Sequence, residues 1–251
     1  MEQKESGRWI MRSKSNPRLR LFCFPYAGGS ASIFRRWPEL LPAEVEVCPV
    51  YLPGREHRFY EPGFTDIHAL AEALSNALLP YTDIPFALCG YSMGAEICYI
   101  WACHLRKLYG KEPAHMIVAA QRAPQLPSRN ALIHHLPDKE FLDGLYRLGG
   151  TPAAVMQNKE LMELMLPMLR ADFTLYETYT YVPDEPFTCS MSAFYGEQDR
   201  FVSAVEMVSW REQTRGPFTL TGIPGEHFFL HSAQELFLQT VSRELQNVLN
   251  K

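Results

Sequence analysis

The sequence predicts an α/β fold in which a mostly parallel central sheet is flanked by helices. Short apolar runs alternate with longer stretches that carry apolar residues at helical spacing, as in strands joined by helical crossovers. The chain has 251 residues, of which 47% are hydrophobic and 21% are charged. One α/β domain commonly occupies this length. We therefore expect residues 1–251 to form a single domain.

The individual elements follow from the spacing of apolar residues. Short apolar runs predict strands at residues 19–24, 45–50, 86–89, 115–120, 190–195 and 218–220. Apolar residues at helical spacing predict helices at 67–79, 95–109 and 233–249. Gly110 directly follows the second of these helices, where glycine commonly ends a helix.

The stretch 136–181 interrupts the alternation of strands and helices. It contains two helical patterns separated by Gly-Gly-Thr-Pro at 149–152, and no convincing strand. Helices inserted over the carboxyl edge of a sheet often cover an active site, so we expect a helical lid here. The alternative is that these helices simply pack on a face of the sheet. Pro167 is expected to kink or break the second helix.

A Gly-Tyr-Ser-Met-Gly motif occupies residues 90–94, between a predicted strand and a predicted helix. G-x-S-x-G in this context forms a tight turn that lifts the serine hydroxyl above the sheet edge, and bulky neighbours would clash there. The amide of Met93 then lies at the positive end of the helix, where it can stabilise an oxyanion. We predict that Ser92 is a nucleophile. The alternative is a tight connection without catalytic function.

A serine nucleophile requires a histidine base and an acid that orients the histidine. On this type of turn the partners follow in the order serine, acid, histidine. Asp199 lies in a turn after the fifth predicted strand, and His227 lies on a loop after the sixth. We predict the triad Ser92, Asp199 and His227, with Glu197 as the second choice of acid. His231 is expected to fall in the helix that begins nearby.

The loop 24–30, Phe-Pro-Tyr-Ala-Gly-Gly-Ser, follows the first predicted strand. A second oxyanion donor is expected from such a loop, and its glycines allow close approach of the backbone to a substrate. We assign this donor to the amide of Ala27. A phosphate-binding loop is the alternative, but neither G-x-x-x-x-G-K-[ST] nor G-x-G-x-x-G is present.

Several motifs together resemble a known family, the type II thioesterases of polyketide and nonribosomal peptide synthetases and their animal fatty-acid-synthase relative. The matching segments run in order from about residue 9 to the end of the chain. They are FPYAGGS at 24–30, LPGRE at 52–56 with EP at 61–62, GYSMGA at 90–95, LGGTP at 148–152, LRAD at 169–172 and GEHFFL at 225–230.

This resemblance implies an α/β-hydrolase that removes acyl groups from the phosphopantetheine thiol of carrier proteins. The implied role is editing, the removal of aberrant or stalled acyl groups. The family's triad matches Ser92, Asp199 and His227, and its oxyanion hole matches the amides of Ala27 and Met93. No cofactor or metal is expected beyond the phosphopantetheine on the carrier, which would be engaged transiently and in trans. The thioester substrate rests on the resemblance alone.

Two positions depart from the family. Many members have histidine where this chain has Tyr26 and Tyr91. Both are expected beside the substrate pocket, where tyrosine keeps an aromatic ring and a hydrogen-bonding tip but does not titrate near neutrality. The departures therefore bear on acyl preference and pH behaviour.

Methionines concentrate in the predicted lid, and flexible thioethers can adapt to acyl chains of different shape. They are Met156, Met162, Met165 and Met168. We expect them to line the substrate pocket, with ordinary core packing as the alternative.

Composition narrows the location and the partners. Lys and Arg number 24 against 28 Asp and Glu, without long blocks of either sign, which argues against a nucleic-acid partner. The longest stretch without charge, 21–34, is too short to span a membrane. The first twenty residues carry no apolar signal segment, so we expect a cytoplasmic protein. Rival functions are a general carboxylesterase or lipase, a medium-chain fatty acyl carrier thioesterase, and a non-catalytic binder on the same scaffold.

Overall fold

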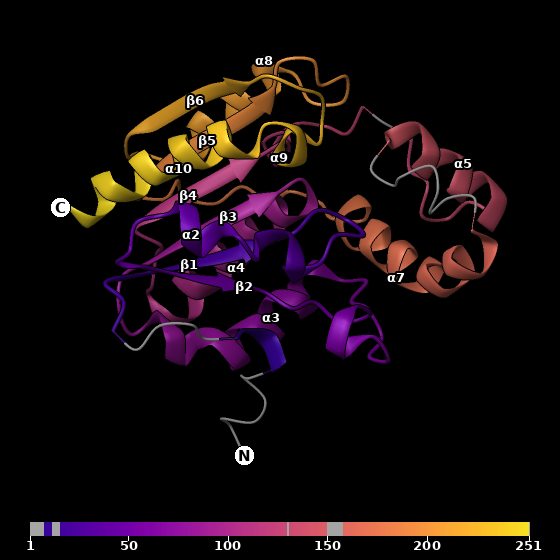
Figure 1. The fold of residues 1–251 in the computed structure, drawn as a ribbon, viewed down its shortest axis with the longest axis horizontal. Helices are drawn as coiled ribbons and strands as arrows, with labels where there is room; N and C mark the ends of the chain where they lie inside the picture. Colours follow the sequence, from indigo (N-terminus) through magenta and orange to yellow (C-terminus); the bar gives the residue numbers. More distant parts are fainter. Residues whose placement is uncertain (1–7, 12–15, 130, 150–157, 251) are drawn as a thin grey trace.

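A central parallel sheet organises the molecule in the computed structural model, which describes residues 8–11, 16–129, 131–149 and 158–250. Its six strands are ordered β2-β1-β3-β4-β5-β6, and every neighbouring pair is parallel (Figure 1). The strands are β1 (Leu19–Phe24), β2 (Val45–Pro49), β3 (Phe86–Tyr91), β4 (His115–Ala119), β5 (Ser190–Gly196) and β6 (Phe218–Ile223).

All six predicted strands are present, and β3 and β6 are longer than predicted by two and three residues. β3 continues to Tyr91 because its ladder with β4 extends to the pair Tyr91 and Ala119. β6 continues to Ile223, which pairs with Gly196 at the end of β5. Pairing with a neighbour thus extends both strands through residues whose own sequence marks a turn. The predicted mostly parallel α/β fold is confirmed.

The two faces of the sheet are covered by different helices. Along β1, Phe22 and Phe24 belong to the apolar cluster that includes residues of α3 and α4, whereas Leu21 and Cys23 belong to the cluster that includes residues of α2 and α10. Alternate residues of a strand point to opposite faces, so β1 is apolar toward both faces, apart from the buried Arg20, which pairs with Glu46 of β2. The α-helices are α2 (Trp37–Leu40), α3 (Ile67–Leu78), α4 (Met93–Tyr109), α5 (Asp138–Leu148), α7 (Lys159–Glu177), α8 (Ala204–Val208), α9 (Phe229–Ser232) and α10 (Gln234–Leu249). Short 3₁₀ helices occupy Ala31–Phe34, Glu56–Arg58, Leu79–Thr82 and Ser209–Gln213.

The insertion between β4 and β5 carries α5 and α7, which lie beyond the carboxyl ends of the strands (Figure 1). These helices share an apolar cluster of their own, formed by Phe141, Leu145, Met162, Met168, Leu169 and Phe173. α7 runs through Pro167 as one helix, so the expected break does not occur.

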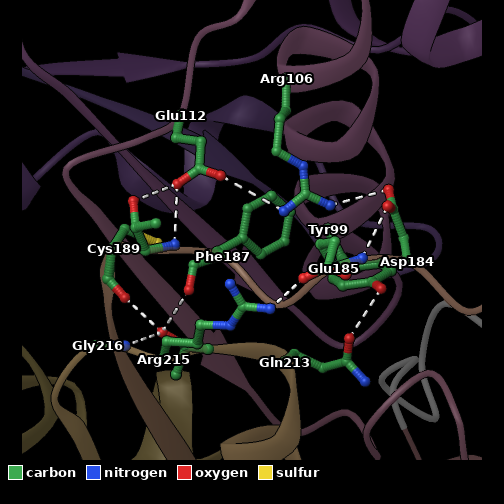
Figure 2. A network of polar contacts seen from close by, with 12 residues as sticks. Tyr99, Arg106, Glu112, Asp184, Glu185, Phe187, Cys189, Gln213, Arg215 and Gly216 are labelled. Carbon is green, nitrogen blue, oxygen red and sulfur yellow. Dashed lines mark hydrogen bonds and ion pairs between the residues drawn. The ribbon is translucent and has the colours of Figure 1, made fainter.

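At the opposite end of the sheet, a polar network fixes the segments that lead into β5 (Figure 2). Arg106, near the end of α4, forms ion pairs with Glu112 at 3.4 Å and with Asp184 at 2.9 Å. Its guanidinium also lies 4.4 Å from the ring centre of Phe187. Glu112 accepts hydrogen bonds from the amide and hydroxyl of Thr188. Arg106 therefore connects the carboxyl end of α4 to the entry of β5.

The described ranges contain no helix that is both long and apolar enough to cross a membrane.

Candidate active site

Ser92 stands at the sharp turn between β3 and α4. Its backbone has φ of 52° and ψ of −123°, a conformation that L-residues rarely adopt. A Cβ atom added at Gly90 would lie 2.2 Å from the carbonyl oxygen of Gly94, and one at Gly94 would lie 2.2 Å from that of Phe24. Both motif glycines are thus required by close backbone contacts, as the sequence predicted. The amide of Ser92 donates to Ala119 at 2.8 Å, which holds the turn against β4.

The structure brings the three predicted triad side chains together. Nε2 of His227 lies 3.2 Å from Oγ of Ser92, and Nδ1 of His227 lies 2.8 Å from Oδ2 of Asp199. The other carboxylate oxygen of Asp199 accepts bonds from the amides of Phe201 and Val202. Glu197, the second choice of acid, is exposed. The Asp199 side chain is fully buried, so its carboxylate has a fixed orientation toward the histidine.

Tyr91 supports the histidine loop from below. Its hydroxyl donates to the backbone carbonyl of His227 at 2.5 Å and accepts from the amide of Leu230 at 3.3 Å. The side chain is buried, and burial raises the pKa of its hydroxyl well above the ordinary value. Tyr91 therefore holds the histidine loop, and it is not among the described residues that line the cavity.

Tyr26 does lie on the cavity wall, as predicted. Its hydroxyl is 2.8 Å from Nε2 of His231, which lies in α9 as expected. Burial raises the pKa of Tyr26 and lowers that of His231, so the neutral forms of both are favoured. The two rings connect the glycine loop after β1 to α9.

The glycine loop after β1 is held by a buried ion pair. Arg55 binds Asp172 of α7 through two bonds of 2.9 and 2.5 Å, and both side chains are buried. Asp172 also accepts from the amide of Gly28 at 2.8 Å, and Arg55 donates to the carbonyl of Gly29 at 2.9 Å. This ion pair joins the loop that carries Ala27 to the inserted helix α7.

The structure places one predicted oxyanion donor in the cavity wall and the other directly after the nucleophile in the chain. Ala27 lines the same cavity as Ser92. Met93 is the first residue of α4, where the helix itself offers no acceptor for the amide. The positive end of the helix favours negative charge near this amide. The arrangement can stabilise an anion that forms on an acyl group attached to Ser92.

A cavity of about 200 Å³ lies above the triad and below the insertion. Apolar side chains from both parts of the molecule line it, namely Leu126, Leu132, Leu145, Leu148, Leu169 and Phe173. Polar groups line it as well, including Glu96, Gln121, Arg122, Tyr176 and Tyr179. The cavity can hold an acyl group that has both apolar and polar parts.

Glu96 is the polar lining residue with the most unusual surroundings. It lies in α4 close to Ser92 and is only 7% exposed. Burial raises the pKa of its carboxyl group to about 8. Sequence reasoning did not select Glu96 as a site residue, although Glu96 directly follows the GYSMGA segment.

The three predicted methionines within the described residues are not in the cavity lining. Met162 and Met168 are buried in the apolar cluster of the insertion, and Met165 packs against the same cluster. Met168 also contacts the segment at Gly54, where an added Cβ would lie 3.0 Å from its Cγ. Met156 falls outside the described residues. The alternative of core packing therefore describes the three methionines whose positions are known.

Sequence reasoning also missed the Arg55–Asp172 pair. Both residues lie in segments that carry the family resemblance, Arg55 in LPGRE and Asp172 in LRAD. Their membership in these two motifs is the sequence signal that could have suggested the pair. Within the described part of the chain, no group of three or more His, Cys, Asp or Glu side chains could hold a metal ion.

Comparisons with known proteins agree with this geometry. A family model described as a thioesterase domain matches residues 19–245. The linear gramicidin dehydrogenase LgrE of Brevibacillus parabrevis is 44% identical over 248 residues, covering 97% of this chain and 94% of that protein. Thioesterase PikA5 of Streptomyces venezuelae is 38% identical over 245 residues, covering 96% of this chain and 86% of that protein.

The fold is also similar to that of a solved structure. The type II thioesterase BorB from the borrelidin biosynthetic cluster superposes with a TM-score of 0.85 at 33% identity. The match covers 94% of this chain and 97% of the BorB chain. The similarity therefore extends over the sheet, the site and the insertion.

Proposed function

The chain belongs to the thioesterase family, and from this premise we propose that it removes acyl groups from the phosphopantetheine thiol of carrier proteins. The proposed role is editing of aberrant or stalled acyl groups in nonribosomal peptide or polyketide synthesis. Support comes from relatives whose names refer to gramicidin, and from a similar structure assigned to borrelidin biosynthesis. The observation that carries the activity is the alignment of Ser92, His227 and Asp199 beneath a cavity of acyl size.

In the proposed reaction, Oγ of Ser92 attacks the thioester carbonyl carbon while Nε2 of His227 accepts the hydroxyl proton. The amides of Ala27 and Met93 hold the oxyanion, and Asp199 stabilises the imidazolium. The carbon–sulfur bond then breaks, and His227 gives its proton to the leaving thiolate. Water, deprotonated by the same histidine, hydrolyses the acyl-enzyme. The route uses only side chains, backbone amides and water.

The pantetheine arm would enter through a second cleft on the outer side of His227. This cleft, of about 450 Å³, is lined by Arg147, Arg200, Gly225 and His231 among others. Both arginines are exposed, and their positive charges suit the phosphate of the arm. Action in trans on a separate carrier, in the cytoplasm, is part of this proposal. Support for action in trans is that the match covers 94% of LgrE and 97% of the BorB chain, which leaves no room for a carrier domain in those two proteins.

Hydrolysis of an acyl-loaded carrier protein tests the proposal directly. Wild-type protein should release the acyl group with turnover, and Ser92→Ala should lose at least about 10³-fold in kcat because the nucleophile is removed. A fluorophosphonate probe should label wild type and leave Ser92→Ala unlabelled. Near wild-type hydrolysis by Ser92→Ala would overturn the assignment, and absence of labelling in wild type would indicate a non-catalytic binder.

Two rival activities use the same triad. A general carboxylesterase would hydrolyse free activated esters faster than carrier-bound thioesters, and a fatty acyl thioesterase would prefer medium-chain acyl groups. The apolar residues of the cavity, such as Leu145 and Phe173, favour the second rival. A panel of carrier proteins loaded with acetyl, aminoacyl and medium-chain groups, compared with a free ester, separates the three activities.

A further inference from the structure

Glu96 places a carboxyl group in the wall of the acyl cavity. Ser92 and Glu96 both line the cavity. Ser92 directly precedes α4, and Glu96 lies in the first turn of the same helix. Glu96 is more than nine-tenths buried, so the cavity is where its carboxyl group meets a ligand.

Protein groups do little to satisfy this carboxyl group. Its one hydrogen bond among the described residues comes from the side-chain nitrogen Nε2 of Gln121. This distance, 3.5 Å, is at the outer limit for a hydrogen bond. Arg122 also lines the cavity, but its guanidinium donates to the carbonyl of Pro127 at 2.8 Å and lies 4.0 Å from Glu206. Glu96 therefore has no ion pair within the described part of the chain.

Glu177, a second acidic residue on the cavity wall, has the hydrogen-bond partners that Glu96 lacks. Glu177 accepts from the amides of Ile133 and His134 and lies 2.7 Å from Nδ1 of His134. Its carboxylate is fully used by the protein. A buried carboxyl without such partners carries a large desolvation cost, which a cationic ligand would offset.

Aromatic groups beside Glu96 also suit a cation. Tyr176 and Tyr179 line the same cavity, and the charge of Glu96 contributes to raising the pKa of both hydroxyls, after the larger effect of burial. The two tyrosines are therefore electrostatically close to the carboxyl group. Aromatic rings together with a carboxylate are the groups that bind ammonium ions in proteins.

We propose that Glu96, with the rings of Tyr176 and Tyr179, forms an amine subsite that binds the ammonium group of an aminoacyl thioester while its carbonyl carbon is attacked by Ser92. This inference rests on the proposed function and specifies the acyl group that the enzyme prefers. An α-amine lies one carbon away from the reacting carbonyl, and Ser92 and Glu96 line the same cavity, so a single ligand can contact both. Glu96 is thus a specificity residue.

A matched pair of substrates tests the subsite. Alanyl and isobutyryl thioesters of the same carrier protein have nearly the same shape, but isobutyryl has a methyl group where alanyl has its ammonium. Each rate is corrected with the Ser92→Ala protein, because aminoacyl thioesters hydrolyse spontaneously. Wild type should have the higher kcat/KM for alanyl. In Glu96→Gln this preference should fall at least about tenfold, the effect of losing one charge-assisted hydrogen bond, with isobutyryl hydrolysis retained.

The control is Glu163→Gln, which removes an exposed carboxylate from α7 and should leave the preference unchanged. Glu96→Met provides a second test if the glutamine variant unfolds, and thermal unfolding of each variant verifies the fold. A preference for isobutyryl in wild type, or an unchanged ratio in a folded Glu96 variant, would overturn the amine subsite while leaving the thioesterase activity intact. Failure of wild type to hydrolyse either thioester would instead refute the proposed function.

Discussion

Helix α4 connects two regions that differ in whether their charged side chains are paired. Near its carboxyl end, Arg106 pairs with Glu112 and Asp184 and anchors the entry to β5 (Figure 2). At its amino end, Ser92 and Glu96 face the cavity, and Glu96 has no cationic partner among the described residues. One helix thus carries a satisfied polar network at one end and an unsatisfied site at the other.

The pKa directions in the two regions express the same difference. Burial tends to raise the pKa values of Glu112 and Asp184. Hydrogen bonds from Thr188 and Arg106 to Glu112, and the ion pair between Arg106 and Asp184, hold both values below the ordinary ones. Burial without such partners raises the pKa of Glu96 to about 8. Charges that stabilise the fold are paired within the protein, whereas the unpaired group faces the place where a substrate would bind.

The largest effect is expected at the triad. Asp199→Asn should reduce kcat on the order of 10⁴-fold, because the histidine loses the charge and acceptor that fix its tautomer. Glu197→Gln is the matched control, since Glu197 is exposed and neighbours Asp199 in the same turn. Steady-state hydrolysis of an acyl-loaded carrier measures both. A larger loss in Glu197→Gln than in Asp199→Asn would show that the acid has been assigned to the wrong residue.

A smaller but still large effect is expected at the buried Arg55–Asp172 pair. Asp172→Asn should lower the free energy of unfolding by about 3 kcal/mol, because it leaves a buried guanidinium without its counter-charge. It should also lower kcat more than it changes KM, because the glycine loop that carries Ala27 loses its anchor. Urea unfolding and initial rates measure the two effects.

The control for this pair is Asp138→Asn, which breaks the exposed ion pair with Arg170 in the same insertion. Exposed pairs contribute little, so we expect a change of at most about 0.5 kcal/mol. Equal losses in the two variants would contradict the idea that burial makes the Arg55–Asp172 pair important.

At the cavity, Glu96→Gln should have a pH-dependent effect on stability. The pKa of Glu96 is about 8 in the folded protein and about 4.3 in an unfolded chain. The stability contributed by the protonated group is therefore complete below about pH 4 and is lost as the pH rises toward 8. The free energy of unfolding of Glu96→Gln, relative to that of wild type, should therefore rise by at least ~1 kcal/mol between pH 5 and pH 8. Urea unfolding across this range measures the gain, and a constant difference would argue against a raised pKa.

The smallest effect is expected in the network at the other end of α4. Arg106→Gln should cost ~1 kcal/mol at neutral pH and leave kcat nearly unchanged, since Arg106 lies at the end of the sheet opposite the site. The lowered pKa values of Glu112 and Asp184 mean that their stabilisation is present above about pH 4 and is lost as the pH falls through their folded values. The difference in free energy of unfolding between Arg106→Gln and wild type should therefore become smaller at acidic pH.

Arg215→Gln serves as the control for Arg106, because its ion pair with Glu185 in the same network is exposed on both sides. Its thermal unfolding should match that of wild type. If the stability difference between Arg106→Gln and wild type became larger at acidic pH, this would contradict the ion pairs of Arg106 with Glu112 and Asp184 (Figure 2).

Local patterns in the sequence were sufficient for the sheet and for the identities of the triad. Each strand is an apolar run, and Ser92, Asp199 and His227 each follow a strand whose carboxyl end reaches the same edge. A parallel sheet brings those ends together whatever the length of the intervening chain. The methionines of α7 show the limit of this reasoning. Helical spacing marks an apolar face but does not say whether it meets a cavity or the other helix of the insertion.

The positions of the strands and of the catalytic residues along the chain could be read from local patterns, because hydrophobic periodicity and tight-turn glycines act over a few residues. Which distant groups lie in contact depends on how the elements pack together. Arg55 and Asp172 are 117 positions apart, and their pairing depends on where α7 docks. The protonation of Glu96 likewise depends on burial, which raises its pKa more than the charge of Arg122 lowers it. Desolvation and charge pairing are properties of the packed surroundings, and a linear pattern of residues does not specify them.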